Sequence, residues 1–161
     1  MEIRKTTQKD IEGILKIYES ARKFMAENGN PDQWSNIHPE ERVILKDIEK
    51  GNHFVCLDEG RLAGCFAFIK GDDPTYRIIV KGNWLDYKPY AVIHRLAVLE
   101  HGKGTGSICI DWCLNQHGNI RIDTHQDNIP MQRLIAKKGF KYCGRIYTSW
   151  GDERLAFQKS E

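Results

Sequence analysis

The sequence lacks the features of a membrane protein or a secreted protein. No apolar run approaches the length of a membrane span, and residues 1–5 contain no signal-peptide core. We therefore expect a cytoplasmic protein that has no membrane partner. Charge of neither sign dominates, because 24 lysines and arginines stand against 22 acidic residues and leave a net charge of +2. This balance gives no reason to expect a nucleic-acid partner.

Paired cysteines, repeats and linkers are also missing. The five cysteines contain no Cys-x-x-Cys pair, and Cys109 and Cys113 lie one helical turn apart among apolar residues. We interpret all five as reduced packing residues, so we expect no metal site and no redox role. The 161 residues suit one domain with one core, and we expect a single domain over 1–161. The sequence leaves open whether two copies form a homodimer.

The periodicity of apolar residues predicts a mixed order of strands and helices. The predicted elements are, in chain order, a strand at 1–5, a helix from Thr7 to about Glu27, a helix from Pro39 to Gly51, strands at 53–57, 61–69 and 91–98, a helix after 106, a strand at 119–125, a helix at 130–138, a strand ending at Tyr147 and a strand at 154–158. Residues 76–80 are ambiguous between strand and loop. This order predicts an α/β (α+β) fold in which helices cover both faces of a mixed, twisted central sheet.

A glycine-rich turn at residues 102–106 organises the second half of the chain. It joins an apolar, β-branched strand pattern to a helical pattern. Glycines let main-chain N–H groups approach an anion, and a helix N-terminus adds partial positive charge. We therefore predict that the main chain of Lys103, Gly104, Thr105 and Gly106 binds a diphosphate, with the Lys103 side chain as a charge partner. The alternative is a tight connection that binds nothing.

The turn does not match the common nucleotide-binding motifs. Residues 102–106 read Gly-x-Gly-x-Gly, without the Gly-Lys-Ser/Thr ending of a P-loop or the Gly-x-Gly-x-x-Gly spacing of a dinucleotide site. A nucleotide-binding protein is therefore the weakest of the functions that we consider.

An ordered set of residues around the turn resembles a known family. The set comprises Leu96-Ala97-Val98, the turn at 102–106, Asn128 and the run Leu134…Lys137-Lys138-Gly139-Phe140. It is similar to the acetyl-CoA-binding core of the GNAT (Gcn5-related) N-acetyltransferase superfamily, and it covers the C-terminal part of the chain. The resemblance implies a GNAT-like sheet whose two central parallel strands, at 91–98 and 119–125, splay apart and admit the pantetheine arm of acetyl-CoA.

The resemblance also assigns contacts to acetyl-CoA, the implied co-substrate. It implies that Leu96, Ala97 and Val98 bind the pantetheine arm, that the main chain of Val98 polarises the thioester carbonyl, and that Asn128 contacts the same arm. Two features depart from the family pattern. His101 stands where an arginine or glutamine usually opens the loop, and the link after Val98 is shorter than usual.

Direct transfer of an acetyl group to an amine requires a base, because an ammonium ion has no lone pair with which to attack. His94 is our first candidate. Strict alternation would place it on one strand face with Leu96 and Val98, looking into the splay, and an imidazole pKa of about 6.5 suits proton removal at neutral pH. Asp123 and His125 share a face of the next strand and form a second option. The alternative for His94 is a hydrogen-bonded histidine of the core. The alternatives for the second pair are that Asp123 caps a loop and that His125 faces solvent.

The departing thiolate needs a proton donor, and the residue that many family members use is replaced in this chain. Many family members have a tyrosine after the leucine of the last helix, and this chain has Ile135 in that place. Tyr142, Cys143 and Tyr147 lie just downstream and are our candidates for the acid. A structural role is the alternative for each of them.

The acceptor amine is expected to lie against aromatic and acidic residues. The aromatic residues that flank loops are Trp34, Tyr76, Trp84 and Tyr90. The carboxylates that could hold a cationic amine beside them are Asp32, Asp72, Asp73 and Asp86. Core packing is the alternative for each aromatic residue.

We therefore predict an acetyl-CoA-dependent N-acetyltransferase without a metal. It would transfer the acetyl group directly from the thioester to a primary amine of a small molecule or a peptide. The rival prediction is a non-catalytic acyl-CoA-binding or regulatory module on the same fold, which Ile135 and the altered loop would suit.

Overall fold

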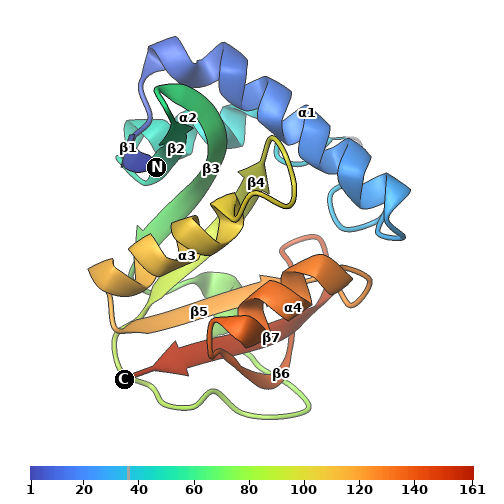
Figure 1. Ribbon diagram of the computed structural model, residues 1–161. Coiled ribbons are helices and arrows are strands. Elements are labelled where there is room, and N and C mark those ends of the chain that lie inside the picture. The colour runs from blue at the N-terminus through green and yellow to red at the C-terminus, as the bar shows by residue number, and fades with distance from the viewer. Residues whose placement is uncertain (36) are drawn as a thin grey trace.

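The computed structural model describes residues 1–35 and 37–161, and these form one sheet of seven strands (Figure 1). The strands lie in the order β1-β2-β3-β4-β5-β7-β6. Their bounds are β1 Glu2–Lys5, β2 His53–Asp58, β3 Arg61–Lys70, β4 Ala91–Val98, β5 Asn119–Thr124, β6 Lys141–Tyr147 and β7 Glu153–Ser160. The helices are α1 Ile11–Glu27, α2 Glu41–Glu49, α3 Thr105–Gln116 and α4 Ile129–Lys137. Only β4 and β5 pair in parallel among the described strands, so the sheet is mixed, as predicted.

The elements follow the predicted order, with small differences at their ends. The first helical segment opens with a 3₁₀ turn, Gln8–Asp10, before α1 begins at Ile11. The ambiguous stretch 76–80 is not a strand. Its first residue, Tyr76, ends a second 3₁₀ turn, Pro74–Tyr76, and of the stretch only Val80 makes an isolated bridge, to Arg145 of β6.

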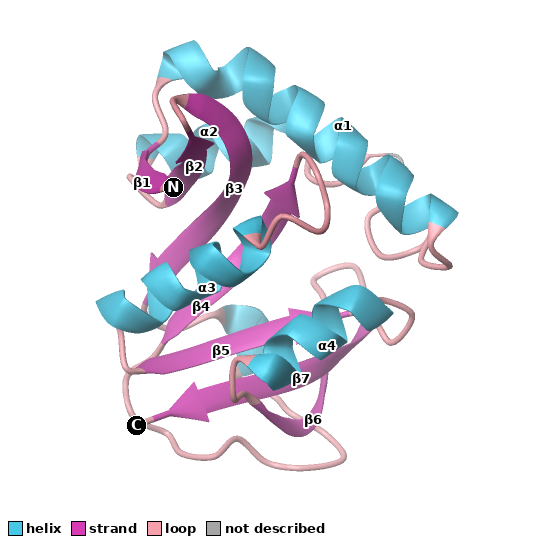
Figure 2. Cartoon of the chain, in the orientation of Figure 1, coloured by secondary structure: helices cyan, strands magenta, loops and turns pink. Residues whose placement is uncertain are grey.

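Helices cover both faces of the sheet, which confirms the predicted fold class. Alternate residues of β2 show the two faces. Phe54 and Cys56 join a buried cluster with α3 and α4, whereas Val55 and Leu57 join a second cluster with α1 and α2. Figure 2 shows α3 and α4 on the viewer's side of the strands. Each large apolar side chain buried in these clusters stabilises the fold by about 1.5–3 kcal/mol.

The parallel strands β4 and β5 diverge, as the resemblance implied. They pair only at Ala91 with Ile120 and at Val92 with Arg121. Each strand stays paired on its other side, β4 with β3 as far as Val98 and β5 with β7 along its whole length. The arrows of the two strands separate toward their heads in Figure 2. The carboxyl-terminal halves of β4 and β5 therefore face each other without strand hydrogen bonds.

A β-bulge in β4 lies next to this divergence. The pairing of His94 with Ala67 and of Ala97 with Cys65 leaves one extra residue on β4, and Arg95 has a positive φ of 54°. A bulge bends and twists its strand, which turns β4 away from β5. A non-glycine residue in this conformation costs about 1–2 kcal/mol, so neighbouring groups must stabilise it.

Two buried side chains stabilise the bulge. Asp47 of α2 accepts two hydrogen bonds from the Arg95 guanidinium, from Nε at 2.8 Å and from Nη2 at 2.9 Å. Tyr18 of α1 donates its hydroxyl proton to the Arg95 carbonyl oxygen at 2.9 Å. The same hydroxyl lies 2.9 Å from Nε2 of His53, and Nδ1 of His53 lies 2.7 Å from the Thr6 hydroxyl. The two N-terminal helices thus hold the backbone of β4 at the start of the splay.

None of the described helices combines the length and the apolar composition that crossing a membrane requires.

Candidate active site

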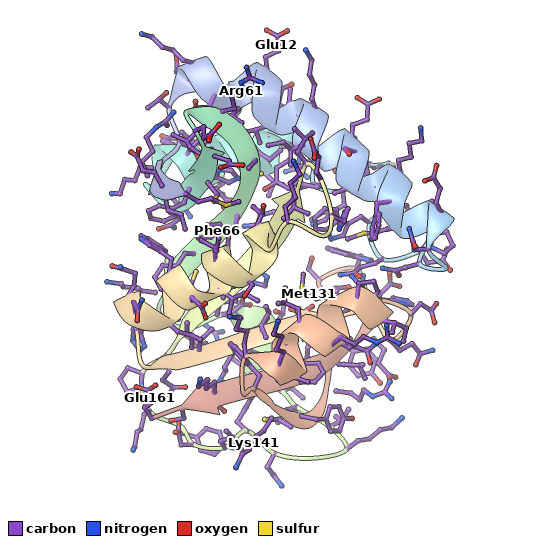
Figure 3. The ribbon with its side chains drawn as sticks, in the orientation of Figure 1. Glu12, Arg61, Phe66, Met131, Lys141 and Glu161 are labelled. Atoms are coloured by element: carbon purple, nitrogen blue, oxygen red, sulfur yellow. The ribbon has the colours of Figure 1, made fainter. Side chains whose placement is uncertain are left out.

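Two cavities meet at the splay. The first, of about 280 Å³, is lined by the glycine turn and is called here the glycine-loop cavity. The second, of about 330 Å³, lies between the diverging strands and is called the β4–β5 cavity. The residues that line both cavities are Met25, Leu96, Asn128 and Met131. Met131 lies on α4 at this junction (Figure 3). A long, thin ligand could therefore reach from one cavity into the other.

The backbone of the turn is shaped for an anion. Gly104 has a φ of 77° and caps α3 without any side-chain hydrogen bond to the first helical turn. Gly102 has a φ of 84°, and a Cβ at either glycine would meet no atom within 4 Å. The turn therefore needs glycine for its conformation and leaves space over it. Uncapped N–H groups at a helix N-terminus, open to a cavity, are a general diphosphate site.

The charged residues near the turn differ from the prediction. Lys103 does not line the glycine-loop cavity and instead pairs with Glu100 at 2.8 Å, and both side chains are more than half exposed. Lys137 of α4 lines the cavity and can supply a cation there. His101 stacks on Phe24 with ring centroids 3.4 Å apart, and burial lowers the pKa of its imidazole. The ring therefore forms part of the cavity wall and does not supply a positive charge to an anion.

The strand end and Asn128 lie where an extended ligand would pass. Leu96, Ala97 and Val98 all line the glycine-loop cavity. Asn128 lines both cavities, accepts a hydrogen bond from Met131 N as the cap of α4, and donates to Gln33 Oε1 at 2.9 Å. The glycine cradle, the free edge of β4 and the apolar wall together fit the diphosphate and the pantetheine arm of CoA.

A cluster of polar residues lines the β4–β5 cavity. His94 Nε2 lies 2.6 Å from Asp73 Oδ2, and His94 Nδ1 lies 4.0 Å from Asp123 Oδ2. Tyr76 donates its hydroxyl proton to the same Asp123 oxygen at 2.6 Å. Thr75 donates to Asp73 Oδ1 from its N–H and from its hydroxyl. The imidazole is thus held between two carboxylates, each of which is held by a further donor.

The pKa shifts agree with these contacts. Burial raises the pKa of Asp73, but the hydrogen bond and charge of His94, with the two bonds from Thr75, outweigh it and lower the value to about 2. Burial and then the Asp123 charge raise the pKa of Tyr76 well above its usual value. Asp73 is therefore an anion at neutral pH, and Tyr76 keeps the proton that it donates.

The face on which His94 lies was predicted wrongly. Strict alternation placed His94 with Leu96 and Val98, but the extra residue at Arg95 shifts the alternation by one. Ile93 and Leu96 therefore share the cluster under α3 and α4, while His94 turns to the opposite face with Asp123. It still lines the cavity, because the cavity opens through the splay.

The aromatic candidates have different positions. Trp34 lines the β4–β5 cavity, and Tyr76 lies behind it, fully buried, in contact with Asp123. Trp84 and Tyr90 line neither cavity. They lie against the two sides of the Arg121 guanidinium, at 4.2 and 3.9 Å from its carbon, which is a core arrangement.

The remaining catalytic candidates lie away from the two cavities. His125 Nδ1 accepts a hydrogen bond from Asp127 N and borders a separate surface hollow. Tyr142 and Tyr147 are about half exposed on β6 and contact Arg145 and Glu153. Of the residues that the structure describes, no tyrosine lines either cavity.

Of the four carboxylates that were predicted to hold the acceptor amine, only Asp73 lines the β4–β5 cavity. Asp86 binds Asn119 and Gln158, Asp72 pairs with Arg77 on the surface, and Asp32 borders the hollow beside His125. The described residues contain no group of three or more histidines, cysteines or carboxylates placed to hold a metal ion.

Sequence reasoning missed several residues of the cavity. They are Gln33, His38, Trp150 and Arg154, which come from loops and from the start of β7. Burial lowers the pKa of His38 to about 4, so its ring is neutral. No local motif marks these residues, since only the sheet order brings the β7 end of the chain beside the loop after α1.

Comparison with known proteins identifies relatives over most of the chain. The family model described as "Acetyltransferase (GNAT) family" matches residues 14–140. A solved GNAT-family acetyltransferase from Streptococcus agalactiae is 31% identical, with 99% of this chain and 95% of that chain covered and a TM-score of 0.91.

Two more distant structures share the fold. A GNAT-family acetyltransferase from Listeria monocytogenes is 20% identical over 99% of this chain and 94% of that chain, with a TM-score of 0.72. A ribosomal-protein-alanine N-acetyltransferase from Brucella melitensis is 17% identical over 100% of both chains, with a TM-score of 0.69. At these identities the likeness shows the fold alone. No curated protein matches the sequence significantly.

Proposed function

Because this chain belongs to the GNAT acetyltransferase family and is therefore an acyltransferase, we propose that it transfers an acetyl group directly from acetyl-CoA to a primary amine bound in the β4–β5 cavity. The observation that carries the proposal is the position of His94. This residue lines the cavity that joins the glycine-loop cavity, and Asp73 holds its ring at 2.6 Å.

His94 is the proposed base. In the tautomer with its proton on Nε2, the ring donates to Asp73 and leaves the lone pair of Nδ1 on the side of Asp123. An ammonium group that approaches both Nδ1 and Asp123 from the cavity side, within hydrogen-bond distance of each, would be attracted by the carboxylate and would lose one proton to Nδ1. Asp73 would then stabilise the imidazolium ion that forms. In this scheme Tyr76 keeps Asp123 in place through its hydrogen bond.

The free edge of β4 is the proposed oxyanion site. Beyond Val92 its main chain has no strand partner on the β5 side, so N–H groups there can bind the thioester carbonyl oxygen as negative charge develops on it. Bound acetyl-CoA supplies the activated acetyl group. After attack the nitrogen carries two protons and releases one of them to solvent as the amide forms. We infer that the sulfur leaves as a thiolate that takes a proton from solvent, since no tyrosine of the described residues lines either cavity.

The test is a matched pair of histidine variants. His94→Gln should lower acetyl-CoA-dependent thiol release with amine acceptors by about 100-fold or more at pH 7, because general base catalysis contributes on that order. The loss should shrink at pH 9, where more of the amine is already neutral. CoA affinity should not change. His125→Gln serves as the control, because His125 lies outside both cavities. Equal activity in the two variants would remove His94 from this role.

A further inference from the structure

The β4–β5 cavity contains an arginine whose charge no carboxylate neutralises at close range. Arg154 of β7 lines the cavity and is only 3% exposed. Its Nη1 and Nη2 donate to main-chain oxygens, of Glu153 at 3.1 Å and of Gln33 at 2.9 Å. Within the described part of the chain, no carboxylate oxygen lies within the 4.0 Å of an ion pair with it.

The other arginine of the cavity shows the contrast. Arg95 is also largely buried, but Asp47 pairs with it at 2.8 Å. Burial is the main cause that lowers the pKa of Arg154, and the charges of Asp123 and Asp152 only partly offset it. A buried guanidinium without a close anion is costly, so an anion bound in the cavity beside Arg154 would be stabilised by it.

Arg154 and the proposed base lie on the same side of the sheet. Asp123 of β5 pairs with Ala156 of β7, and Arg154 is two residues from Ala156 on the same strand face. Such diagonal neighbours are roughly 7–8 Å apart. The cavity thus has one end with Asp73, His94 and Asp123, which suits an amine, and a cationic end a few bond lengths away.

We propose that Arg154 binds a carboxylate of the acceptor, so that the acceptor is a small amino-acid-like molecule rather than the N-terminus of a peptide. This specificity rests on the proposed acetyl transfer to an amine in the same cavity. The amine lies toward His94 and Asp123, and the carboxylate lies against the guanidinium.

A carboxylate fits this site better than a phosphate. Arg154 uses two of its five N–H donors on main-chain oxygens, and the others can form the paired bonds that a planar carboxylate accepts. Thr148 and Ser149 line the same cavity and add hydroxyl donors. A doubly charged phosphate would call for a second free cation, and among the described lining residues His38 is neutral and Arg95 is already paired.

The experiment compares matched acceptors. The common L-α-amino acids, β-alanine and γ-aminobutyrate are each paired with their carboxamides, which keep the amine and lose the negative charge. For at least one pair, kcat/KM of the native protein should be about 10–100-fold higher for the carboxylate, as expected for charge-assisted hydrogen bonds. Phosphoethanolamine is tested as a third type of acceptor, which carries a phosphate in place of the carboxylate. If its kcat/KM is higher than that of every carboxylate acceptor, the assignment to a carboxylate is wrong.

Arg154→Gln should remove the preference. Its kcat/KM should fall at least tenfold more for the carboxylate than for the matched carboxamide. Arg133→Gln, which removes an exposed arginine of α4 outside both cavities, should keep the native ratio. An equal fall for both acceptors in Arg154→Gln would show a structural role and overturn the proposal. If Arg154→Gln does not fold, Arg154→Lys replaces it, and the ratio should still fall because the two-pronged contact is lost.

Direct binding separates this inference from the proposed function. The same pairs are titrated calorimetrically into the native protein and into the Arg154 variant, with CoA present. If no amine is acetylated, the proposed function fails. Carboxylate-dependent binding that Arg154→Gln abolishes would still support the inference, and equal binding of carboxylate and carboxamide by the native protein would overturn it.

Discussion

His94 and Asp73 form a 2.6 Å contact between Nε2 and Oδ2, although they lie 21 residues apart in the sequence. His94 comes from the middle of β4, just before the bulge, and Asp73 comes from the loop that follows β3. The contact fixes the plane of the imidazole ring, and it determines which nitrogen faces Asp123 at the other end of the ring. In the proposed reaction, the base is therefore oriented by a loop and not by the sheet alone.

The first prediction concerns Asp73. Asp73→Asn keeps the size of the side chain but removes the charge that stabilises a protonated His94, so kcat should fall by about 10–100-fold while the KM for acetyl-CoA stays unchanged. Steady-state thiol release at several pH values measures both. Asp72→Asn is the matched control, since Asp72 lies on the surface in a pair with Arg77. A kcat that changes no more in Asp73→Asn than in the control would contradict the assignment.

The second prediction concerns the support of the bulge. Asp47→Ala leaves the Arg95 guanidinium without its partner, and breaking a buried pair in this way costs about 3–5 kcal/mol of the free energy of unfolding. Because Arg95 sits in the bulge, the KM for acetyl-CoA should rise as well. Urea unfolding and steady-state kinetics measure these effects. Glu40→Ala, which breaks the exposed pair with Arg42, should cost less than about 1 kcal/mol.

The third prediction concerns stability in acid. Burial is the main cause that lowers the pKa of His38 and of His53 to about 4, from an ordinary value of 6.5. The unfolded chain therefore binds more protons between these values. Each histidine contributes stability that is present above about pH 6.5 and is lost as the pH falls toward 4, by up to ~3 kcal/mol.

Urea unfolding between pH 7.5 and 4 measures this loss. Asp10 and Asp73 have pKa values of about 2, below the ordinary 3.8, so their contributions are lost mainly below pH 4 and reach this window only at its acid end. His53→Gln should have a lower free energy of unfolding than the native protein at pH 7. Between pH 6.5 and 4, however, its free energy of unfolding should fall by less than that of the native protein. If the free energy of unfolding of this variant depends on pH as steeply as that of the native protein, the assignment to His53 is wrong.

The fourth prediction concerns the glycine turn. Gly104→Ala places a side chain at a φ of 77°, which costs about 1–2 kcal/mol and reshapes the main chain at the start of α3. CoA affinity should fall by at least tenfold. Gly29→Ala is the control, because Gly29 has a similar φ of 81° and open space around it but lies after α1, outside both cavities. It should lose similar stability without losing affinity for CoA, as calorimetry with each variant would show.

The sequence predicted the elements that have a local pattern. The alternation in β2 and β3, the glycine turn before α3 and the cap residue Asn128 before α4 are all readable within a few residues. These local signals were sufficient for the order of elements and for the fold class. The general position of the glycine-loop cavity follows from the same signals.

The sequence did not predict the features that depend on the tertiary structure. A bulge shifts the alternation of side chains between the two faces of a strand, and no residue type in this sequence marks its position. The face on which His94 lies therefore could not be predicted from the spacing of residues. Arg154 lies beside Gln33 only because β7 is inserted between β5 and β6, a placement that no local pattern specifies. Ile135, which stands where many family members have a tyrosine, is fully buried, and no described tyrosine lines either cavity.

Because β4 and β5 pair over only a short length, the sheet has two unpaired strand edges in its middle, in addition to those of its outermost strands. Unpaired edges on the outside of a protein invite strands of other molecules and promote aggregation. Here the two edges face each other across a wedge that residues of α1 and α4 help to line. The unpaired main-chain groups of β4 and β5 can thus form hydrogen bonds with an extended ligand in the wedge, while they are kept away from the strand edges of other protein molecules in a crowded solution.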